Sequence, residues 1–213
     1  MWRIALALLD DAFDGAPPLE RLALFEGRDS DSIAVLRTMI ERGVNAPLAR
    51  GVGRYFDAVG ALVLSRAASR YEGQIAMEWN LVAAAAERGR YPFAVDRARE
   101  PWELDLRPMV RRIVSDLLAG ESAARISARF HHTLTAATAE IIETLPVETR
   151  CAPVVLAGGA FQNALLAEGM IDRLADRRVL LPRQAPPGDG GIALGQALVA
   201  DASLRARGER RCV

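Results

Sequence analysis

The chain has 213 residues, 51% hydrophobic and 25% charged, a composition ordinary for a globular protein with one sizeable core or two small lobes. Its 27 acidic groups balance its 27 basic groups, so no overall field attracts nucleic acid or an anionic membrane. The sequence contains no lysine, which excludes both a P-loop lysine and a Schiff-base lysine.

The two cysteines, Cys151 and Cys212, form no metal-binding spacing, and they are typical of a reducing cytosolic compartment. Apolar runs fall short of the ~18 residues that a membrane span needs. The start, "MWRIALALLDD", has one basic residue and is followed by acids, which argues against a signal peptide. We therefore expect a cytoplasmic protein that does not bind membranes.

The first 150 residues predict a mostly helical region. Ser or Asp caps at 30–32 and a stop at Gly43 delimit one helix, and the segment 53–67 is apolar all round, which predicts a buried helix. Short β-prone segments predict a small hairpin within 91–106. Helices are expected over 29–43, 53–67, 74–89, 108–120 and 121–145, with Pro108 in a first turn.

From Pro153 onward, strands alternate with helices. We expect a buried strand over 154–156, a helix over about 160–176, a strand over 179–181 and a helix over 192–202. This alternation predicts a helix-rich α/β fold, with a parallel or mixed sheet flanked by helices.

Two glycines, Gly158 and Gly159, follow the first of these strands. They let a ligand approach the main chain closely, at the sheet edge where α/β folds bind ligands and next to a helix N-terminus. The alternative is a tight connection without a ligand. In the next helix, the amides of Gln162 and Asn163 are placed either to contact a base or ribose or to lie on solvated helix surface.

The second glycine-rich segment, "PPGDGG", surrounds the carboxylate of Asp189. An aspartate before a helix is most often an N-cap. Three neighbouring glycines give more backbone freedom than a cap requires, so a role near a metal or phosphate is the alternative.

Two acidic positions in the helical region also pose a choice. Asp57 lies in an apolar helix and needs a donor partner, either an arginine such as Arg50 or Arg54 or the hydroxyls of a ligand. Glu72, Gly73 and Gln74 stand at a helix start, where they either cap the helix or contact a ligand. The adjacent His131 and His132 point about 100° apart on a helix and cannot hold one metal together, so packed histidines are expected.

Five segments in order resemble the HypF family of hydrogenase-maturation carbamoyltransferases, and "WRIALALL" adds to the likeness. The resemblance implies the carbamoyl-transfer domain, with an actin/hexokinase-like two-lobed ATPase fold, related to threonylcarbamoyl transferases of the TsaD type. It covers most of the chain from about residue 45. The segments are "GRYFDAVGALVL", "YEGQIAMEWN", "RFHHTL", "VVLAGGAFQNALL" and "VLLPRQAPPGDGGIALGQALVA".

The resemblance implies an activity and its site. The family makes carbamoyl adenylate from carbamoyl phosphate and ATP and passes the carbamoyl group to the C-terminal cysteine of HypE. A divalent metal (zinc, iron or magnesium) is implied with ATP. The implied cofactor-binding residues are Asp57, Glu72, Gly73, Asn163 and, beneath the nucleotide, Gly158 and Gly159; Asp189 is the implied metal ligand.

The sequence departs from the family pattern in several places. The histidine pair of the metal site is missing, as are the segments that normally come first; Ala49-Arg50 replaces a serine pair, and Gly188 replaces asparagine. We therefore expect a partial lobe, inactive alone, with a mostly helical part at 1–150 and a nucleotide- and metal-binding part at 151–213. It would be a fragment, a split subunit or a truncated gene model.

Two other functions remain open. The first is a decayed paralogue that only binds a maturation partner without catalysis. The second is a TsaD-like role in tRNA modification, which the absence of a basic stripe disfavours.

Overall fold

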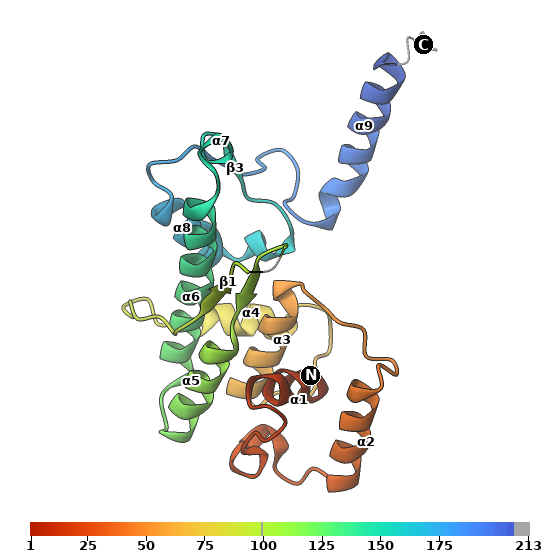
Figure 1. The fold of residues 1–213 in the computed structure, drawn as a ribbon, viewed down its shortest axis with the longest axis vertical. Coiled ribbons are helices and arrows are strands. Elements are labelled where there is room, and N and C mark those ends of the chain that lie inside the picture. Colours follow the sequence, from red (N-terminus) through yellow and green to blue (C-terminus); the bar gives the residue numbers. More distant parts are fainter. Residues whose placement is uncertain (99, 207–213) are drawn as a thin grey trace. The chain divides into compact units, whose positions relative to one another are not determined.

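The computed structural model describes residues 1–98 and 100–206 (Figure 1). The chain divides into two compact units, Met1–Ile141 and Ile142–Val213, and each is described by itself. Cys212 lies outside the described residues. Within the described residues, no helix is both long and apolar enough to cross a membrane.

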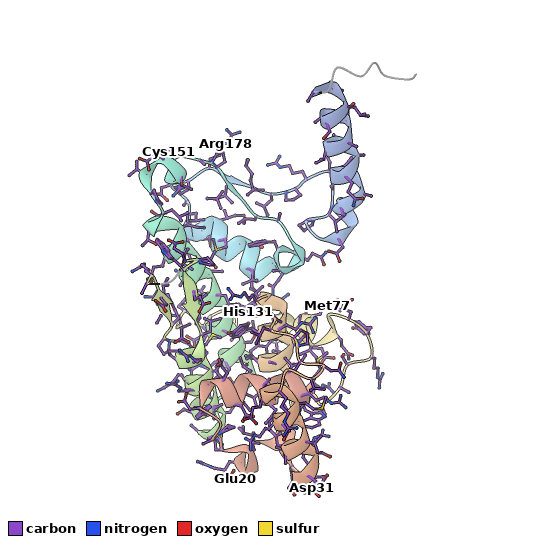
Figure 2. The ribbon with its side chains drawn as sticks, turned by 45° about the vertical axis from the view of Figure 1, so that its right-hand side comes forward. Glu20, Asp31, Met77, His131, Cys151 and Arg178 are labelled. Atoms are coloured by element: carbon purple, nitrogen blue, oxygen red, sulfur yellow. The ribbon has the colours of Figure 1, made fainter. Side chains whose placement is uncertain are left out.

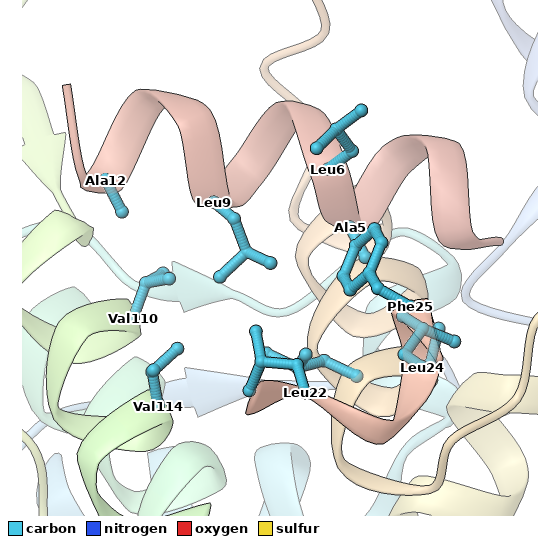
Figure 3. Packing of buried hydrophobic residues seen from close by; sticks show 11 residues of the cluster. Ala5, Leu6, Leu9, Ala12, Leu22, Leu24, Phe25, Val110 and Val114 are labelled. Carbon is cyan, nitrogen blue, oxygen red and sulfur yellow. The ribbon is translucent and has the colours of Figure 1, made fainter. Parts of the chain in front are cut away.

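The core of the first unit forms around helix α1 (Trp2–Ala12). Its buried residues, Ala5, Leu6, Leu9 and Ala12, recur at the spacing of one helix face. Figure 3 shows this face packed over helix α5 (Arg107–Leu118) and two short 3-10 helices, η1 (Leu19–Arg21) and η2 (Ala23–Phe25). The other buried members of this cluster are Leu22, Leu24, Phe25, Ala61, Leu62, Val110 and Val114.

Helix α3 (Val52–Val63) lies in the middle of the first unit and has seven buried residues, which confirms the prediction of a buried helix. It packs against α4 (Gln74–Leu81) and, through Phe56, against the long helix α6 (Ala123–Thr144). The rings of Phe56 and Phe130 meet edge to face at 5.0 Å. Such aromatic contacts add to the area that both side chains bury.

Other predicted elements of this unit are present with adjusted ends. Helix α2 (Ser30–Glu41) is capped by the side chain of Asp29, one residue before the expected caps. Pro108 stands in the first turn of α5. Strands β1 (Ala94–Asp96) and β2 (Glu103–Asp105) form the expected antiparallel hairpin, with Val95 opposite Leu104.

One helix prediction is wrong at its end. The alanine-rich segment was expected to stay helical to Gly89, but α4 ends at Leu81. The carboxylate of Glu87 accepts hydrogen bonds from the backbone N–H groups of Arg88 and Gly89 and from Arg125 on α6. These contacts hold the turn at residues 87–89. Closer to the helix end, the N–H of Ala84 donates to the carbonyl of Ala124 on α6 at 2.9 Å instead of to an acceptor within α4.

The second unit contains α7 (Val147–Arg150), β3 (Val154–Val155), η3 (Gly159–Gln162), α8 (Ala164–Arg173), β4 (Val179–Leu180), η4 (Asp189–Gly191) and α9 (Ile192–Ala206). Strands β3 and β4 pair in parallel, as the alternation of strands and helices predicted. The expectation of a fully buried strand at 154–156 is wrong: Leu156 is buried, but Val155 is 63% exposed. The two-stranded sheet leaves that side chain uncovered within the described residues.

Candidate functional site

The two glycine-rich turns of the second unit lie against each other. The N–H of Gly158 donates a hydrogen bond to the carbonyl of Pro187 at 2.5 Å. A Cβ on Gly188 would lie 3.3 Å from the Cα of Gly159 and 3.1 Å from Nε2 of Gln162. Residues far apart in the sequence thus form one surface, made of Gly158–Gln162 and Pro187–Gly191, which we call the glycine-turn surface.

The glycines are required for this geometry. Gly158 has φ 99° and ψ 160°, a conformation that residues with a Cβ rarely adopt. At Gly191, a Cβ would lie 2.8 Å from the carbonyl oxygen of Pro186, closer than real contacts allow. The N–H of Gly191 donates to the carbonyl of Gly188 at 2.9 Å and closes the turn. At Gly190, a Cβ would lie 3.1 Å from Cγ of Pro186, so close packing accounts for all three glycines of "PPGDGG".

The glycine-turn surface is open at Gly159. This residue is exposed, and an added Cβ would meet no heavy atom within 4 Å. A ligand can therefore approach the main chain directly beside the N-terminus of α8, where backbone N–H groups favour anions.

Asn163 has a structural role at this turn. Its Oδ1 accepts a hydrogen bond from the N–H of Leu166 at 3.3 Å, so it is the N-cap of α8 and not simply solvated helix surface. Its expected contact with a nucleoside stays a prediction.

Asp189 is the exposed first residue of η4, which continues directly into α9. The residue before it, Gly188, is the N-cap of η4. No group of three His, Cys, Asp or Glu side chains close enough to hold a metal ion is found among the described residues. Asp189 therefore offers one carboxylate ligand, and this part of the chain does not fit a complete metal site.

The remaining predicted site residues, Asp57, Glu72 and Gly73, belong to the first unit. Asp57 is 8% exposed on α3, and its Oδ2 lies 3.0 Å from Nη1 of Arg54. Burial raises the pKa of Asp57, whereas Arg54 lowers it, and the nearby charge of Glu72 raises it further. Two arginines were expected as possible partners of Asp57, and Arg54 is the one that pairs with it. Arg50 instead pairs with Glu103, with 3.5 Å between Nη2 and Oε1.

Gly73, with φ 79°, is the N-cap of α4, and no side chain caps that helix. The exposed Glu72 therefore does not cap it. The third residue of this group, Gln74, makes side-chain hydrogen bonds on both sides of the helix start. Its Oε1 accepts from the N–H of Arg70 at 2.7 Å, and its Nε2 donates to Glu78 at 2.9 Å. Gln74 thus holds the loop that carries Glu72 against the start of α4.

His131 is packed, as predicted, whereas His132 is only half-buried. His131 is 1% exposed inside the first unit (Figure 2). Its Nδ1 lies 2.8 Å from the carbonyl of Ser127, and its ring lies edge to face on Phe56. Burial lowers the pKa of His131 to about 4. His132 instead lies 3.2 Å from the carbonyl of Gly89.

The chain matches the family model described as "Carbamoyltransferase, Kae1-like Domain, second subdomain" over residues 1–196. It is 37% identical to carbamoyltransferase HypF of Rhodobacter capsulatus, over 95% of this chain and 26% of the relative. It is 34% identical to carbamoyltransferase HypF2 of Cupriavidus necator, over 93% of this chain and 27% of the relative. The chain therefore spans about a quarter of the length of these relatives.

Solved structures agree with this match. A crystal structure of full-length HypF in the phosphate- and nucleotide-bound form has 32% sequence identity and a TM-score of 0.85, covering 95% of this chain and 26% of that one. HypF of T. kodakarensis, at 23% identity and a TM-score of 0.75 over 96% of this chain and 28% of that one, shares the fold.

Proposed function

This chain belongs to the HypF family of carbamoyltransferases, and from that premise we propose that it is the nucleotide-binding part of an enzyme of nickel–iron hydrogenase maturation. In this proposal, the complete enzyme forms carbamoyl adenylate from carbamoyl phosphate and ATP in the cytoplasm. It then transfers the carbamoyl group to the C-terminal cysteine of a HypE-like protein. The chain contributes part of an actin/hexokinase-like lobe.

The observation that carries the proposal is the contact between the two glycine-rich turns, through Gly158 and Pro187. Backbone without side chains, beside a helix N-terminus, suits the close approach and negative charge of a nucleotide phosphate. Gly158 and Gly159 would pass beneath the nucleotide, and Asn163 would contact the nucleoside part. Within the first unit, Asp57, Glu72 and Gly73 are proposed as nucleotide-binding residues.

The chemistry of the acyl group explains what such a site must supply. Carbamoyl adenylate is a mixed anhydride that water destroys, so the site has to exclude water while the acceptor approaches. Attack by the cysteine thiolate on the carbamoyl carbon forms the C–S bond and breaks the C–O bond to AMP. AMP leaves with the electron pair and keeps its negative charge near the backbone N–H groups of the turn.

Asp189 is proposed as one ligand of a divalent metal. Because the described residues hold no group of three metal-binding side chains, the remaining ligands would have to come from other polypeptide. No step of the proposed reaction is assigned to that metal.

The test uses a chimera in which this chain replaces the matching quarter of R. capsulatus HypF. Calorimetry with a non-hydrolysable ATP analogue should show binding, and Gly159→Ala should weaken it by tenfold or more, because the new methyl has room in the fold but occupies the ligand side. Gly51→Ala adds the same methyl in equally open space outside both turns and should leave affinity unchanged.

Two outcomes would count against the proposal. If the folded chimera binds no nucleotide, the site is not a nucleotide site. If it captures a HypE-like protein but neither binds nucleotide nor transfers the carbamoyl group, the chain is a partner-binding module without catalysis.

A further inference from the structure

The loop between α3 and α4, residues 64–73, carries Glu72 close to its end. Glu72 is exposed, and within the described residues its side chain takes part in no hydrogen bond or ion pair. Its carboxylate can therefore bind a ligand. The place of that carboxylate depends on the contacts that hold the loop.

Two side chains on α4 hold this loop. Oε1 of Gln74 accepts a hydrogen bond from the N–H of Arg70 at 2.7 Å, and Nε2 of Gln74 donates to Oε1 of Glu78 at 2.9 Å. Oε2 of Glu78 lies 3.3 Å from Nε of Arg66, at the beginning of the loop. Because residues four apart lie on the same face of a helix, Gln74 and Glu78 together connect this face to both halves of the loop.

The helix that provides these contacts is itself fixed within the first unit. Ile75 and Trp79 of α4 are buried and lie against Gly60 of α3. Close packing of this kind leaves a helix little freedom to shift. A loop fastened to α4 therefore takes its position from the packing of α4 on α3.

The loop also brings Glu72 towards the buried carboxylate of Asp57 on α3. Burial raises the pKa of Asp57, and the charge of Glu72 raises it further, so the two carboxylates are close enough to act on each other. Like charges repel, so attraction between these two side chains cannot hold Glu72 in this place. Gln74, two residues after Glu72, supplies a side-chain contact that does.

We propose that Gln74 is a positioning residue, whose amide fastens the loop to α4 and thereby sets the place of the Glu72 carboxylate for a nucleotide. This inference rests on the proposed function, because it takes a nucleotide as the ligand of Glu72. Gln74 acts through Glu72, since the oxygen and the nitrogen of its amide are both bonded within the protein. A loosened loop holds Glu72 in the binding position for only a fraction of the time, and the apparent affinity falls by that fraction.

Hydrogen–deuterium exchange of this chain tests the contact itself. In Gln74→Leu, the amides of residues 66–73 should exchange faster, because leucine keeps the bulk and the helix propensity but accepts no hydrogen bond from Arg70. Exchange in this loop that is no faster than in the unchanged chain overturns the proposal.

Nucleotide affinity tests the consequence, in the chimera in which this chain replaces the matching quarter of R. capsulatus HypF. Calorimetry with a non-hydrolysable ATP analogue should give a Kd about three- to tenfold higher for Gln74→Leu, the range expected for one lost hydrogen bond. The matched control is Asp29→Ala, which also removes a side-chain acceptor of backbone N–H groups at a helix start, that of α2. It should leave the Kd unchanged.

A double-mutant cycle separates positioning from a general loss of stability. Glu72→Gln should itself raise the Kd. Adding Gln74→Leu to Glu72→Gln should then change the Kd by no more than about twofold, because the carboxylate to be positioned is already gone. Losses that multiply independently overturn the proposal, as does an unchanged Kd in either single variant.

The outcome for the unchanged chimera distinguishes this inference from the proposed function. If that chimera binds no nucleotide, the proposed function fails, and the inference fails with it. If it binds nucleotide and Gln74→Leu binds equally well, the inference alone is overturned.

Discussion

Substituting Gly60 by alanine tests the closest approach between two helices of the first unit. Gly60 lies on α3 three residues after Asp57, where a Cβ would lie 2.6 Å from Cγ2 of Ile75 and 3.4 Å from Cβ of Trp79 on α4. Ordinary contact begins near 3.4 Å, so the helices must separate by about 0.8 Å at Ile75. This approach sets how α3, with Asp57, packs on α4.

The neighbours cannot absorb the new methyl group. Ile75 and Trp79 are 1% and 0% exposed. Because isoleucine is branched at Cβ, the χ1 rotamer of Ile75 is restricted in a helix, and its Cγ2 cannot turn away from the new methyl group. Overpacking of this kind costs about 1–3 kcal/mol, and replacing glycine by alanine in a helix returns up to ~1 kcal/mol. The free energy of unfolding should therefore fall by up to about 2 kcal/mol, with Tm lower by up to roughly 8 °C.

Tryptophan fluorescence during urea unfolding is the appropriate assay. All three tryptophans, Trp2, Trp79 and Trp102, belong to the first unit, so the signal reports on that unit. Gly53→Ala is the matched control, because it lies on the same helix and its Cβ would meet nothing within 4 Å. It should leave stability unchanged or raise it by up to ~0.5 kcal/mol.

A double variant isolates the steric cause. Ile75→Leu removes the branch at Cβ while keeping the volume, so it should recover most of the loss caused by Gly60→Ala. Equal stability of Gly60→Ala and Gly53→Ala, or no recovery in the double variant, would refute the close approach of α3 and α4.

Three further predictions concern other parts of the chain. Burial lowers the pKa of His131 to about 4 from 6.5, so the unfolded state binds more protons between these values. The free energy of unfolding should therefore fall as the pH drops from 6.5 towards 4, by up to about 3 kcal/mol, and urea titrations of His131→Asn should show a flatter dependence. Gly191→Ala places a Cβ 2.8 Å from the carbonyl of Pro186, so hydrogen exchange of residues 185–191 should accelerate, and unchanged exchange would contradict the close turn. Arg129→Met removes ion pairs to the buried carboxylate of Asp116 and the half-buried carboxylate of Glu87, which keep Arg112 and Arg125 as partners, and should cost about 1–3 kcal/mol in urea unfolding. Arg125→Met, at a residue 51% exposed, should cost about 1 kcal/mol or less, and equal losses would count against this difference.

The apolar pattern was enough to predict most helices of the first unit. Helix α3 was expected to be buried because its residues are apolar all round, and seven of them are buried. Pro108 was expected in a first turn, where a missing N–H costs nothing, and α5 begins there. These features follow from hydrogen bonds and side chains within a few residues of each other.

The same local pattern failed where a distant residue competes. The alanines after Leu81 favour a helix, but the N–H of Ala84 donates to the distant carbonyl of Ala124, and Glu87 binds two backbone N–H groups and Arg125. Arg125 lies 38 residues further along the chain, so no window around the alanines contains this contact.

For the candidate site, composition alone pointed to Gly158, Gly159 and Asp189 as places where a ligand could reach the backbone. It did not reveal that the N–H of Gly158 donates to Pro187, or that Gly188 and Gly191 are held by close contacts. A glycine in the sequence indicates backbone freedom at its own position, but it does not indicate which other turn of the chain packs against it.

The sequence by itself determined the helix-rich α/β character, the order of the elements and the family, because periodicity and ordered motifs are local properties of the chain. Only the tertiary structure decided which turns meet, that α4 ends at Leu81, and that α9 lies uncovered within the described residues. These outcomes depend on packing between residues far apart in sequence, where steric fit and burial outweigh local preference.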